Sequence, residues 1–182
     1  LMVTFLDVDQ GDAIFIRAPS GRNVLIDGGR ESCGSWVVWP YLRHLGVRKL
    51  DLVVFTHPDS DHIGGLWTIV NNCHVGTVLD SGQKSSSKIY KRCMDVIRVR
   101  RIPIVIGNRG QKINLGYGIK LEVLHPIKAS PLVGTHDDIN NNSIAMRLKY
   151  KNMSLLFLGD IEEEAERNLF DSQSDLRATV MK

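Results

Sequence analysis

Three short apolar runs lie in the first thirty residues, and residues typical of turns separate them. The runs cover residues 2–6, 13–17 and 23–26, and the last one ends on Asp27-Gly28-Gly29. Short apolar runs bounded by glycine, proline and aspartate are typical of strands joined by tight turns. We therefore expect a three-stranded meander at one end of a sheet.

Beyond residue 30 the apolar spacing alternates between that of helices and that of strands. Apolar residues recur at helical spacing over residues 37–45, which predicts a helix that ends before Gly46. Residues 50–56 form a near-continuous apolar run, which predicts a strand buried on both faces. The pattern also predicts helices at 63–70, 88–100 and 162–170, and strands at 75–79, near 104 and 113, and at 119–124, 144–150 and 154–158. This alternation predicts an α/β protein with helices on the outer faces of its sheets.

Composition limits the possibilities without naming a function. The 182 residues, 43% of them apolar and 24% charged, suffice for one globular domain with a core of its own. No apolar stretch approaches the roughly 18 residues of a membrane span, so we expect no membrane insertion by this segment. The net charge of +3 permits a nucleic-acid partner without indicating one. Cys33, Cys73 and Cys93 lack the spacing of a zinc knuckle and are expected to be free thiols.

The strongest chemical signal follows the buried strand that ends near Thr56. Four potential metal ligands, His57, Asp59, Asp61 and His62, fall within six residues, at the point where open α/β sheets place their ligands. His57 and Asp59 can chelate one ion from an extended backbone, and Asp61 and His62 can reach a second. The alternative is a polar helix-capping loop with two surface histidines, which this density of ligands disfavours.

This segment resembles the H-x-[HD]-x-D-H signature of the metallo-β-lactamase superfamily. The runs at residues 5–13, 25–29 and 156–160 resemble further motifs of that family and follow one another in the same order. Aspartate at position 59, where many members have histidine, resembles the nuclease-type domain at the C-terminal end of ComEC competence proteins. Asp9 departs from the D-V-G-Q-G-D run of that branch, which has glycine there. The resemblance implies a metallo-β-lactamase-like αββα four-layer sandwich, formed by residues 1–182 as a single domain with its C-terminal part missing.

The resemblance also implies roles for aspartates outside the loop. Asp160 matches the carboxylate that bridges both metals, and it is a predicted catalytic residue together with Asp61; alternatively, it only caps the helix that follows. Asp27 matches an aspartate that orients the metal ligands without binding the ion. Asp12 is expected to contact substrate or the ligands, or only to form a turn.

Other polar residues carry weaker expectations. Asn140, Asn141 and Ser143 occupy the place where other members supply a further histidine, and they are candidates for substrate contact or a plain loop. His44, His74, His125 and His136 match no motif and are interpreted as loop histidines. One more histidine ligand, in an H-H-G-S-like segment, is implied beyond Lys182, so we expect the 182-residue chain to be inactive.

The donor atoms predict which metal binds, and the resemblance to ComEC proteins suggests the substrate. Mixed imidazole and carboxylate donors suit two divalent ions, zinc or manganese. The leading hypothesis is a phosphodiesterase that cleaves single-stranded DNA during DNA uptake, as a soluble domain of a membrane-anchored protein with a channel. A basic stretch can neutralise phosphates, although a solvated helix face is the preferred interpretation of that stretch: Lys84, Lys88, Lys91, Arg92, Arg98, Arg100 and Arg101. The alternatives are a hydrolase of small esters, lactones or cyclic nucleotides, and a non-catalytic domain that only handles DNA in a transport complex.

Overall fold

A computed structural model describes residues 1–172 and 175–182 of the chain. The chain forms two compact units. The N-terminal unit comprises residues 1–80 and 84–105, and the C-terminal unit comprises residues 81–83 and 106–182. The expectation of one domain over residues 1–182 stays a prediction.

A six-stranded sheet forms the framework of the N-terminal unit, with strand order β1-β2-β3-β5-β7-β8. Its strands are β1 (Met2–Phe5), β2 (Ile14–Arg17), β3 (Asn23–Ile26), β5 (Leu52–Phe55), β7 (Val78–Asp80) and β8 (Ile104–Ile106), the last of which ends at the unit boundary. The first three strands are antiparallel, as the predicted meander requires, and β3, β5 and β7 run parallel. The carboxyl ends of these three parallel strands therefore meet at one edge of the sheet.

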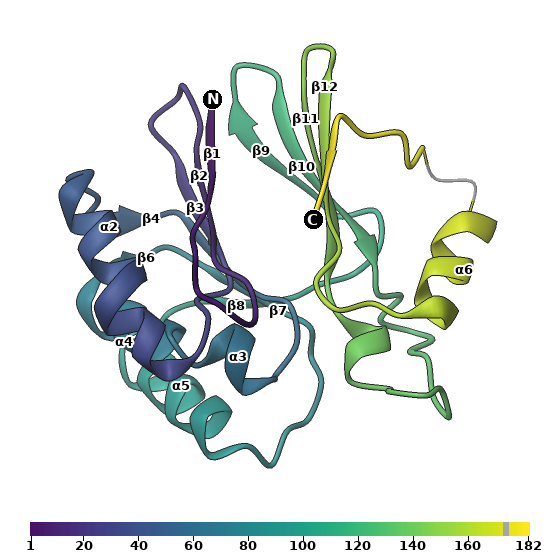
Figure 1. Ribbon diagram of the computed structural model, residues 1–182, viewed down its shortest axis with the longest axis horizontal. Coiled ribbons are helices and arrows are strands. Elements are labelled where there is room, and N and C mark those ends of the chain that lie inside the picture. The colour runs from purple at the N-terminus through teal and green to yellow at the C-terminus, as the bar shows by residue number, and fades with distance from the viewer. Residues whose placement is uncertain (173–174) are drawn as a thin grey trace. The chain divides into compact units, whose positions relative to one another are not determined.

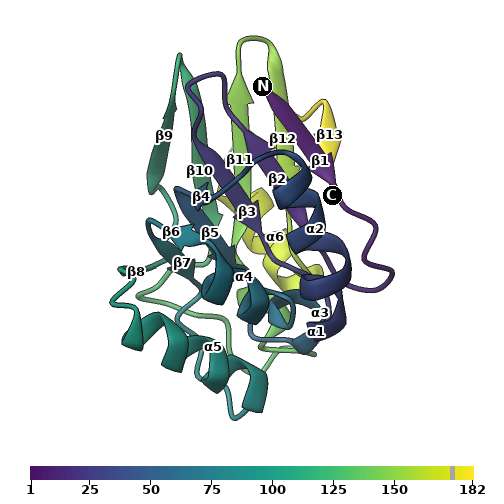
Figure 2. The same ribbon diagram turned by 90° about the vertical axis from the view of Figure 1, so that its left-hand side faces the viewer.

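Helices cover one face of this sheet. They are α1 (Glu31–Cys33), the π-helix η1 (Gly34–Val38), α2 (Trp39–His44), α3 (Ser60–Ile63), α4 (Leu66–Asn72) and α5 (Lys88–Val99). Figures 1 and 2 show α2, α4 and α5 side by side on that face. Phe15, Leu25 and Phe55 from the strands join Leu42 and Ile69 from the helices in one buried core. A short parallel pair, β4 (Lys49–Leu50) and β6 (His74–Val75), lies beside it.

Two predicted helices differ from the structure in a way that matters for the site. The helix expected at 37–45 begins at Glu31, because the π-helical turn over Gly34–Val38 shifts the apolar spacing on which the prediction rested. The helix expected at 63–70 is two helices, α3 and α4, with Gly64 and Gly65 between them. The expected helix at 88–100 is confirmed as α5, but the side chain of its N-cap residue, Ser87, makes no capping hydrogen bond to a described residue.

The C-terminal unit is built on a five-stranded sheet of order β13-β12-β11-β10-β9. Its strands are β9 (Lys112–Gly116), β10 (Ile119–His125), β11 (Ala145–Tyr150), β12 (Met153–Phe157) and β13 (Val180–Met181), and its helices are the 3-10 turn η2 (Asn140–Asn142) and α6 (Glu163–Asp171). Leu124, Ala145 and Leu156 of the sheet pack with Leu169 of α6. Figure 1 shows α6 beside the strands that it covers.

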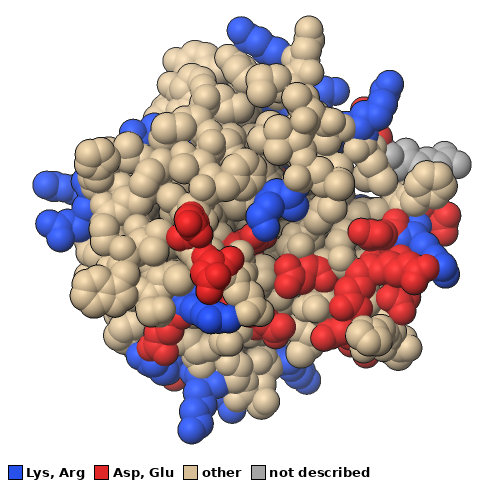
Figure 3. All heavy atoms as spheres, viewed as in Figure 1, with Lys and Arg blue, Asp and Glu red and all other residues tan. Residues whose placement is uncertain are grey.

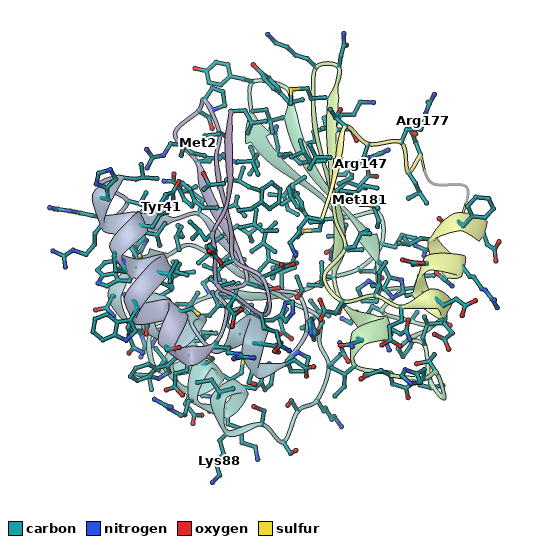
Figure 4. The ribbon with its side chains drawn as sticks, viewed as in Figure 1. Met2, Tyr41, Lys88, Arg147, Arg177 and Met181 are labelled. Carbon is teal, nitrogen blue, oxygen red and sulfur yellow. The ribbon has the colours of Figure 1, made fainter. Side chains whose placement is uncertain are left out.

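The β12-α6-β13 segment is a parallel crossover, since β13 pairs with β12 in parallel register. Arg147 of β11 supports the same region, because its guanidinium donates to the Glu122 carboxylate at 3.0 Å and to the carbonyl of Asp175. Figure 4 labels Arg147 on β11 and Met181 on β13, the two strands that flank β12 in this sheet. An apolar cavity of about 500 Å³ lies along the crossover, between Leu156, Leu169 and Met181.

The α/β class predicted from the sequence is confirmed in both units, each of which combines a sheet with helices on its face. In the described part of the chain, no helix has the length and apolar character needed to cross a membrane.

Candidate metal centre

The predicted metal loop, residues 57–62, leaves the carboxyl end of β5. Asp27 follows β3, the parallel neighbour of β5, so that both segments begin at the same edge of the sheet. His57 and His62 are each 1% exposed, and their rings lie 4.2 Å apart between centroids. The sheet thus brings two buried imidazoles and a buried carboxylate together, as the order of the motifs predicts.

A chain of hydrogen bonds fixes how the two imidazoles are oriented. The Asp27 carboxylate accepts from the Thr56 backbone N–H at 3.0 Å, and from the Thr56 hydroxyl at 2.6 Å. Its Oδ2 atom also lies 2.9 Å from His62 Nδ1. Because a carboxylate only accepts, His62 carries its proton on Nδ1, and the Nε2 lone pair faces away from Asp27.

The same reasoning assigns the tautomer of His57. The Thr56 hydroxyl already donates its single proton to Asp27, so it can only accept from His57 Nδ1, which lies 3.0 Å away. Both rings are therefore protonated on Nδ1 and present Nε2 as the donor atom. Metal-binding histidines have this arrangement, in which a carboxylate or hydroxyl orients the ring through its other nitrogen.

Asp59 adds an oxygen donor next to the imidazoles. Its Oδ2 atom lies 3.8 Å from His57 Nε2, a separation longer than a hydrogen bond and suited to two ligands of one cation. Its side chain is 42% exposed, whereas that of His57 is fully buried. A set of two nitrogen donors and one oxygen donor fits zinc or manganese, so the residues present suit the ion that the motif implies.

Backbone strain marks Asp27 as a specialised position. Asp27 has φ of +55° and is fully buried, and its amide donates to the Val54 carbonyl at 3.0 Å. A left-handed conformation is costly for a residue with a side chain, and it persists where the surroundings demand it. Here the conformation turns the carboxylate toward Thr56 and His62.

Glycines allow other segments to approach the metal loop closely. The Gly28 amide donates to the His62 carbonyl at 2.7 Å. A Cβ atom on Gly65 would lie 2.0 Å from the Gly28 carbonyl oxygen, and one on Gly11 would lie 1.8 Å from the Asp61 carbonyl oxygen. No side chain fits at either place, so the loop that carries the ligands is held between backbone segments.

The loop before β2 contributes to this packing. Asp12 is buried, and its carbonyl oxygen accepts from the Gly29 amide at 2.8 Å. Asp9, which stands where the ComEC-like branch has glycine, adopts φ of +64°. The left-handed conformation explains why glycine suits this position and why aspartate, which tolerates it better than most residues, can replace it.

Asp160 belongs to the C-terminal unit and follows β12 through Gly159, which has φ of +59°. Asp160 is exposed, and helix α6 begins at Glu163 with Glu162 in the N-cap position. The alternative interpretation of Asp160 as the N-cap of this helix is therefore wrong. Its proposed role as a metal ligand stays a prediction.

The asparagine-rich segment is mostly buried. Asn141 and Ser143 are fully buried, whereas Asn140 is partly exposed. All the hydrogen-bonding groups of Asn141 have partners in its own unit. Substrate contact by these three residues stays a prediction.

The interpretation of four histidines as loop residues holds only for His136, whose Nδ1 lies 3.1 Å from the Glu162 carboxylate. His44 ends α2, and His74 lies in β6. His125 ends β10, is 2% exposed and donates from Nε2 to the Asn141 carbonyl at 2.8 Å. Sequence reasoning missed His125, although its position at the end of an apolar run was a signal for burial.

The basic stretch is partly used within its own unit. Arg92 bonds Glu31 at 2.7 Å and stacks over the Trp67 ring, Arg98 bonds Asp95 at 2.8 Å, and Arg100 donates to two backbone carbonyls. Lys88 extends away from the start of α5 (Figure 4), and Lys91 is exposed on the same helix. The exposed lysines remain available to contact phosphates.

Comparison with known proteins agrees with this geometry. The family model described as the metallo-beta-lactamase superfamily matches residues 6–180. The chain is 29% identical to ComE operon protein 3 of Bacillus subtilis over 197 residues, which covers 99% of this chain and 24% of the relative. It is 27% identical to the competence protein ComA of Neisseria gonorrhoeae over 167 residues, which covers 92% of this chain and 21% of the relative.

The chain thus spans about a quarter of the length of these relatives. Among solved structures, an archaeal metallo-β-lactamase superfamily protein from Sulfolobus tokodaii matches with a TM-score of 0.60 at 15% identity, over 98% of this chain and 77% of that one. The predicted resemblance and the predicted fold class are confirmed. The chain belongs to the metallo-β-lactamase superfamily.

Proposed function

We propose that this chain is the hydrolytic domain of a competence protein and that it cleaves phosphodiester bonds of DNA with two divalent metal ions. Membership of a superfamily of metal-dependent hydrolases supports the reaction class. The observation that carries the proposal is the orientation of His57 and His62, both of which are held through Nδ1 by the Asp27-Thr56 pair.

The proposed ligands come from the geometry of the metal loop and from the family motif. His57 and Asp59 would hold one ion, and Asp61 and His62 the second. The motif assigns Asp160 as a ligand shared by both ions. When bound, two divalent ions lower the pKa of a water molecule and stabilise negative charge on the attacked group and the leaving oxygen.

The residues around the ligands reduce the cost of binding. Asp27 and Thr56 fix both rings before a metal arrives, so little side-chain entropy is lost on binding. The buried Asp27 carboxylate also makes the His62 ring more electron-rich, which favours a cation at Nε2. Close backbone contacts at Gly11 and Gly65 hold the path of the loop that carries Asp59 and Asp61.

DNA is the proposed substrate for two reasons. The two relatives are named ComE operon protein 3 and competence protein ComA, and competence is the uptake of DNA. The exposed lysines of α5 offer positive charge to a phosphate backbone. We propose single-stranded DNA, handled by a protein whose other parts lie in a membrane.

The first test measures metal content. The chain is loaded with Zn²⁺ or Mn²⁺ at neutral pH, and the bound ion is counted by non-denaturing mass spectrometry. His62→Ala should remove most of the bound metal, whereas His44→Ala, an exposed histidine on α2, should leave the content unchanged. Equal metal content in both variants would refute the proposed centre.

The second test measures hydrolysis. The chain, and a version extended through the histidine that the resemblance implies, are assayed on single-stranded DNA, double-stranded DNA and a panel of esters and lactones. We expect metal-dependent cleavage of single-stranded DNA by the extended version. Cleavage of esters alone would favour the small-molecule alternative, and binding of DNA without cleavage would favour the non-catalytic one.

A further inference from the structure

The N-terminus of α6 takes its cap from a distant segment. The N-cap residue is Glu162, whose side chain makes no capping hydrogen bond to a described residue. The first amides of a helix have no partner within the helix itself, and a buried amide without one is costly. Partners for two of these amides come from a residue about twenty positions earlier in the chain.

That residue is Asn141, in the 3-10 turn η2. Its Oδ1 atom accepts from the Glu162 amide at 3.1 Å and from the Ala165 amide at 3.2 Å. Its Nδ2 atom donates to the Glu164 carboxylate at 3.0 Å. Two amide donors on one oxygen and a carboxylate on the nitrogen leave a single possible orientation for the side-chain amide.

Asn141 is itself held from the sheet side. It is fully buried, its backbone N–H donates to the Asp137 carbonyl at 2.9 Å, and its backbone carbonyl accepts from His125 Nε2 at 2.8 Å. His125 ends strand β10, so a continuous set of bonds runs from the sheet through Asn141 to the start of α6. Asp160 lies two residues before Glu162, on the short turn between β12 and that anchored amide.

We infer that Asn141 is a positioning residue for Asp160, fixing the turn on which the proposed bridging carboxylate stands. This inference rests on the proposed function, because it takes Asp160 as a metal ligand. A ligand must be held to within about 0.5 Å of its productive place, which an exposed turn achieves only when its ends are anchored. β12 anchors one end of the Asp160 turn, and Asn141 anchors the other.

Asn142 offers a matched control next in the chain. It is 5% exposed and also forms three side-chain hydrogen bonds, to the amide and carbonyl of Leu132 and to the carbonyl of Asp138. These bonds hold the loop before η2 and involve no residue of α6. Asn142→Ala therefore removes a comparable buried asparagine without removing the cap of the helix.

The experiment measures the dissociation constants of Zn²⁺ and Mn²⁺ by chelator competition in the loaded chain. Asn141→Ala should weaken binding about 10- to 100-fold, the range found when a residue that orients a ligand is removed. Asn142→Ala should change it less than about 3-fold, even where both variants lower the melting temperature equally. Equal losses of metal affinity in both variants would overturn the inference.

A double-mutant cycle with Asp160→Ala separates this inference from the proposed function. If Asn141 acts through Asp160, Asn141→Ala should cause no further loss of affinity once Asp160 is alanine. Additive losses would overturn the positioning role. If Asp160→Ala alone leaves affinity unchanged, the ligand assignment in the proposed function fails instead.

A swapped pair covers the case in which Asn141→Ala does not fold. Asn141→Asp keeps the oxygen that accepts from Glu162 and Ala165 but places two carboxylates together, and it should weaken metal binding. Adding Glu164→Gln restores a donor-acceptor pair with its direction reversed, and should recover most of the affinity. Failure of this rescue in a folded double variant would also overturn the inference.

Discussion

The metal loop at residues 57–62 and the Asp160 turn at residues 158–162 are held in different ways. The metal loop is buried, and backbone contacts at Gly11, Gly28 and Gly65 fix its path. In the Asp160 turn, Asp160 is exposed and its neighbours are partly buried, and the helix that follows carries Glu163, Glu164 and Glu166 in its first turn. Figure 3 shows a dense group of acidic side chains, in red, on part of the molecular surface. A side chain from another segment, that of Asn141, fixes the end of this turn.

The difference shows two ways in which a chain can order the proposed metal ligands before an ion binds. In the metal loop, ligands adjacent in sequence share one rigid backbone, so the cost of ordering them is part of the cost of folding. In the Asp160 turn, a single carboxylate depends on a few long-range hydrogen bonds. Substitutions at the metal loop should therefore act on stability and metal together, whereas substitutions around the turn should separate the two.

The largest effect is expected for Gly65→Ala. Gly65 has φ of −67°, which any residue adopts, so the obstacle is steric: the new Cβ atom would lie 2.0 Å from the Gly28 carbonyl oxygen and 2.8 Å from the Gly34 nitrogen. We expect a loss of about 3 kcal/mol in the free energy of unfolding, measured by urea denaturation, and a loss of metal binding.

Gly21→Ala is the control for that variant, because it has open space around the Cβ position and a φ of +85°. Its strain alone should cost about 1 kcal/mol and leave metal binding intact. Equal costs in the two variants would show that close backbone packing does not hold the metal loop.

Asp27→Asn should have the next largest effect. The substitution replaces one carboxylate oxygen with an NH2 group, which can only donate. This group would face a donor on Thr56 or His62, so one hydrogen bond would be lost. We expect a loss of about 1–3 kcal/mol in stability and about 10- to 100-fold in metal affinity.

Asp51→Asn provides the comparison for Asp27. Asp51 accepts from the Asn23 amide at 2.9 Å, away from the metal loop, so its replacement should leave metal affinity unchanged. If Asp27→Asn destabilises the fold without weakening metal binding, Asp27 does not orient the ligands.

The sequence predicts the metal loop because the proposed ligands are close together along the chain and the motif is specific, and in the structure the rings of His57 and His62 lie side by side. The resemblance also implied that Asp27 lies next to that loop, and the structure places its carboxylate 2.9 Å from His62 Nδ1. The sequence could not predict the hydrogen bonds of Asn141 or His125, because their partners lie many residues away in the chain, although the apolar run that His125 ends was a signal for its burial. The early start of the helix at Glu31 was missed for a related reason, since a π-helical turn breaks the spacing on which helix prediction depends.

A smaller effect is expected from pH in the C-terminal unit. Burial lowers the pKa of His125 below its ordinary value of 6.5, with a further contribution from the nearby Arg109. The folded state therefore binds the proton less readily than the unfolded state. The stability that His125 contributes is present above pH 6.5 and is lost as the pH falls below that value.

The measurement is the pH dependence of the free energy of unfolding of the metal-free chain between neutral and acidic pH. His125→Gln can still donate to the Asn141 carbonyl, so it should reduce the slope by up to about one proton. His44→Gln, at an exposed position, should leave the slope unchanged. An unchanged slope in His125→Gln would show that the burial of His125 does not resist protonation.

The smallest effect is expected for Arg167→Ala, and it tests what the Asp160 turn does not depend on. Arg167 bonds Glu163 one turn along α6, and both side chains are more than two-thirds exposed, at 73% and 72%. Exposed pairs of this kind contribute less than about 0.5 kcal/mol, because water screens them and two flexible side chains must be ordered. We therefore expect almost no change in melting temperature and less than about a 2-fold change in Zn²⁺ affinity, against the larger loss in Asn141→Ala.

A loss of affinity in Arg167→Ala equal to that in Asn141→Ala would mean that the surface charge of α6, and not the buried side-chain amide of Asn141 at its start, holds the turn. Repeating the Zn²⁺ measurement in high salt decides between them, since salt weakens an exposed ion pair and leaves the bonds of a buried asparagine intact.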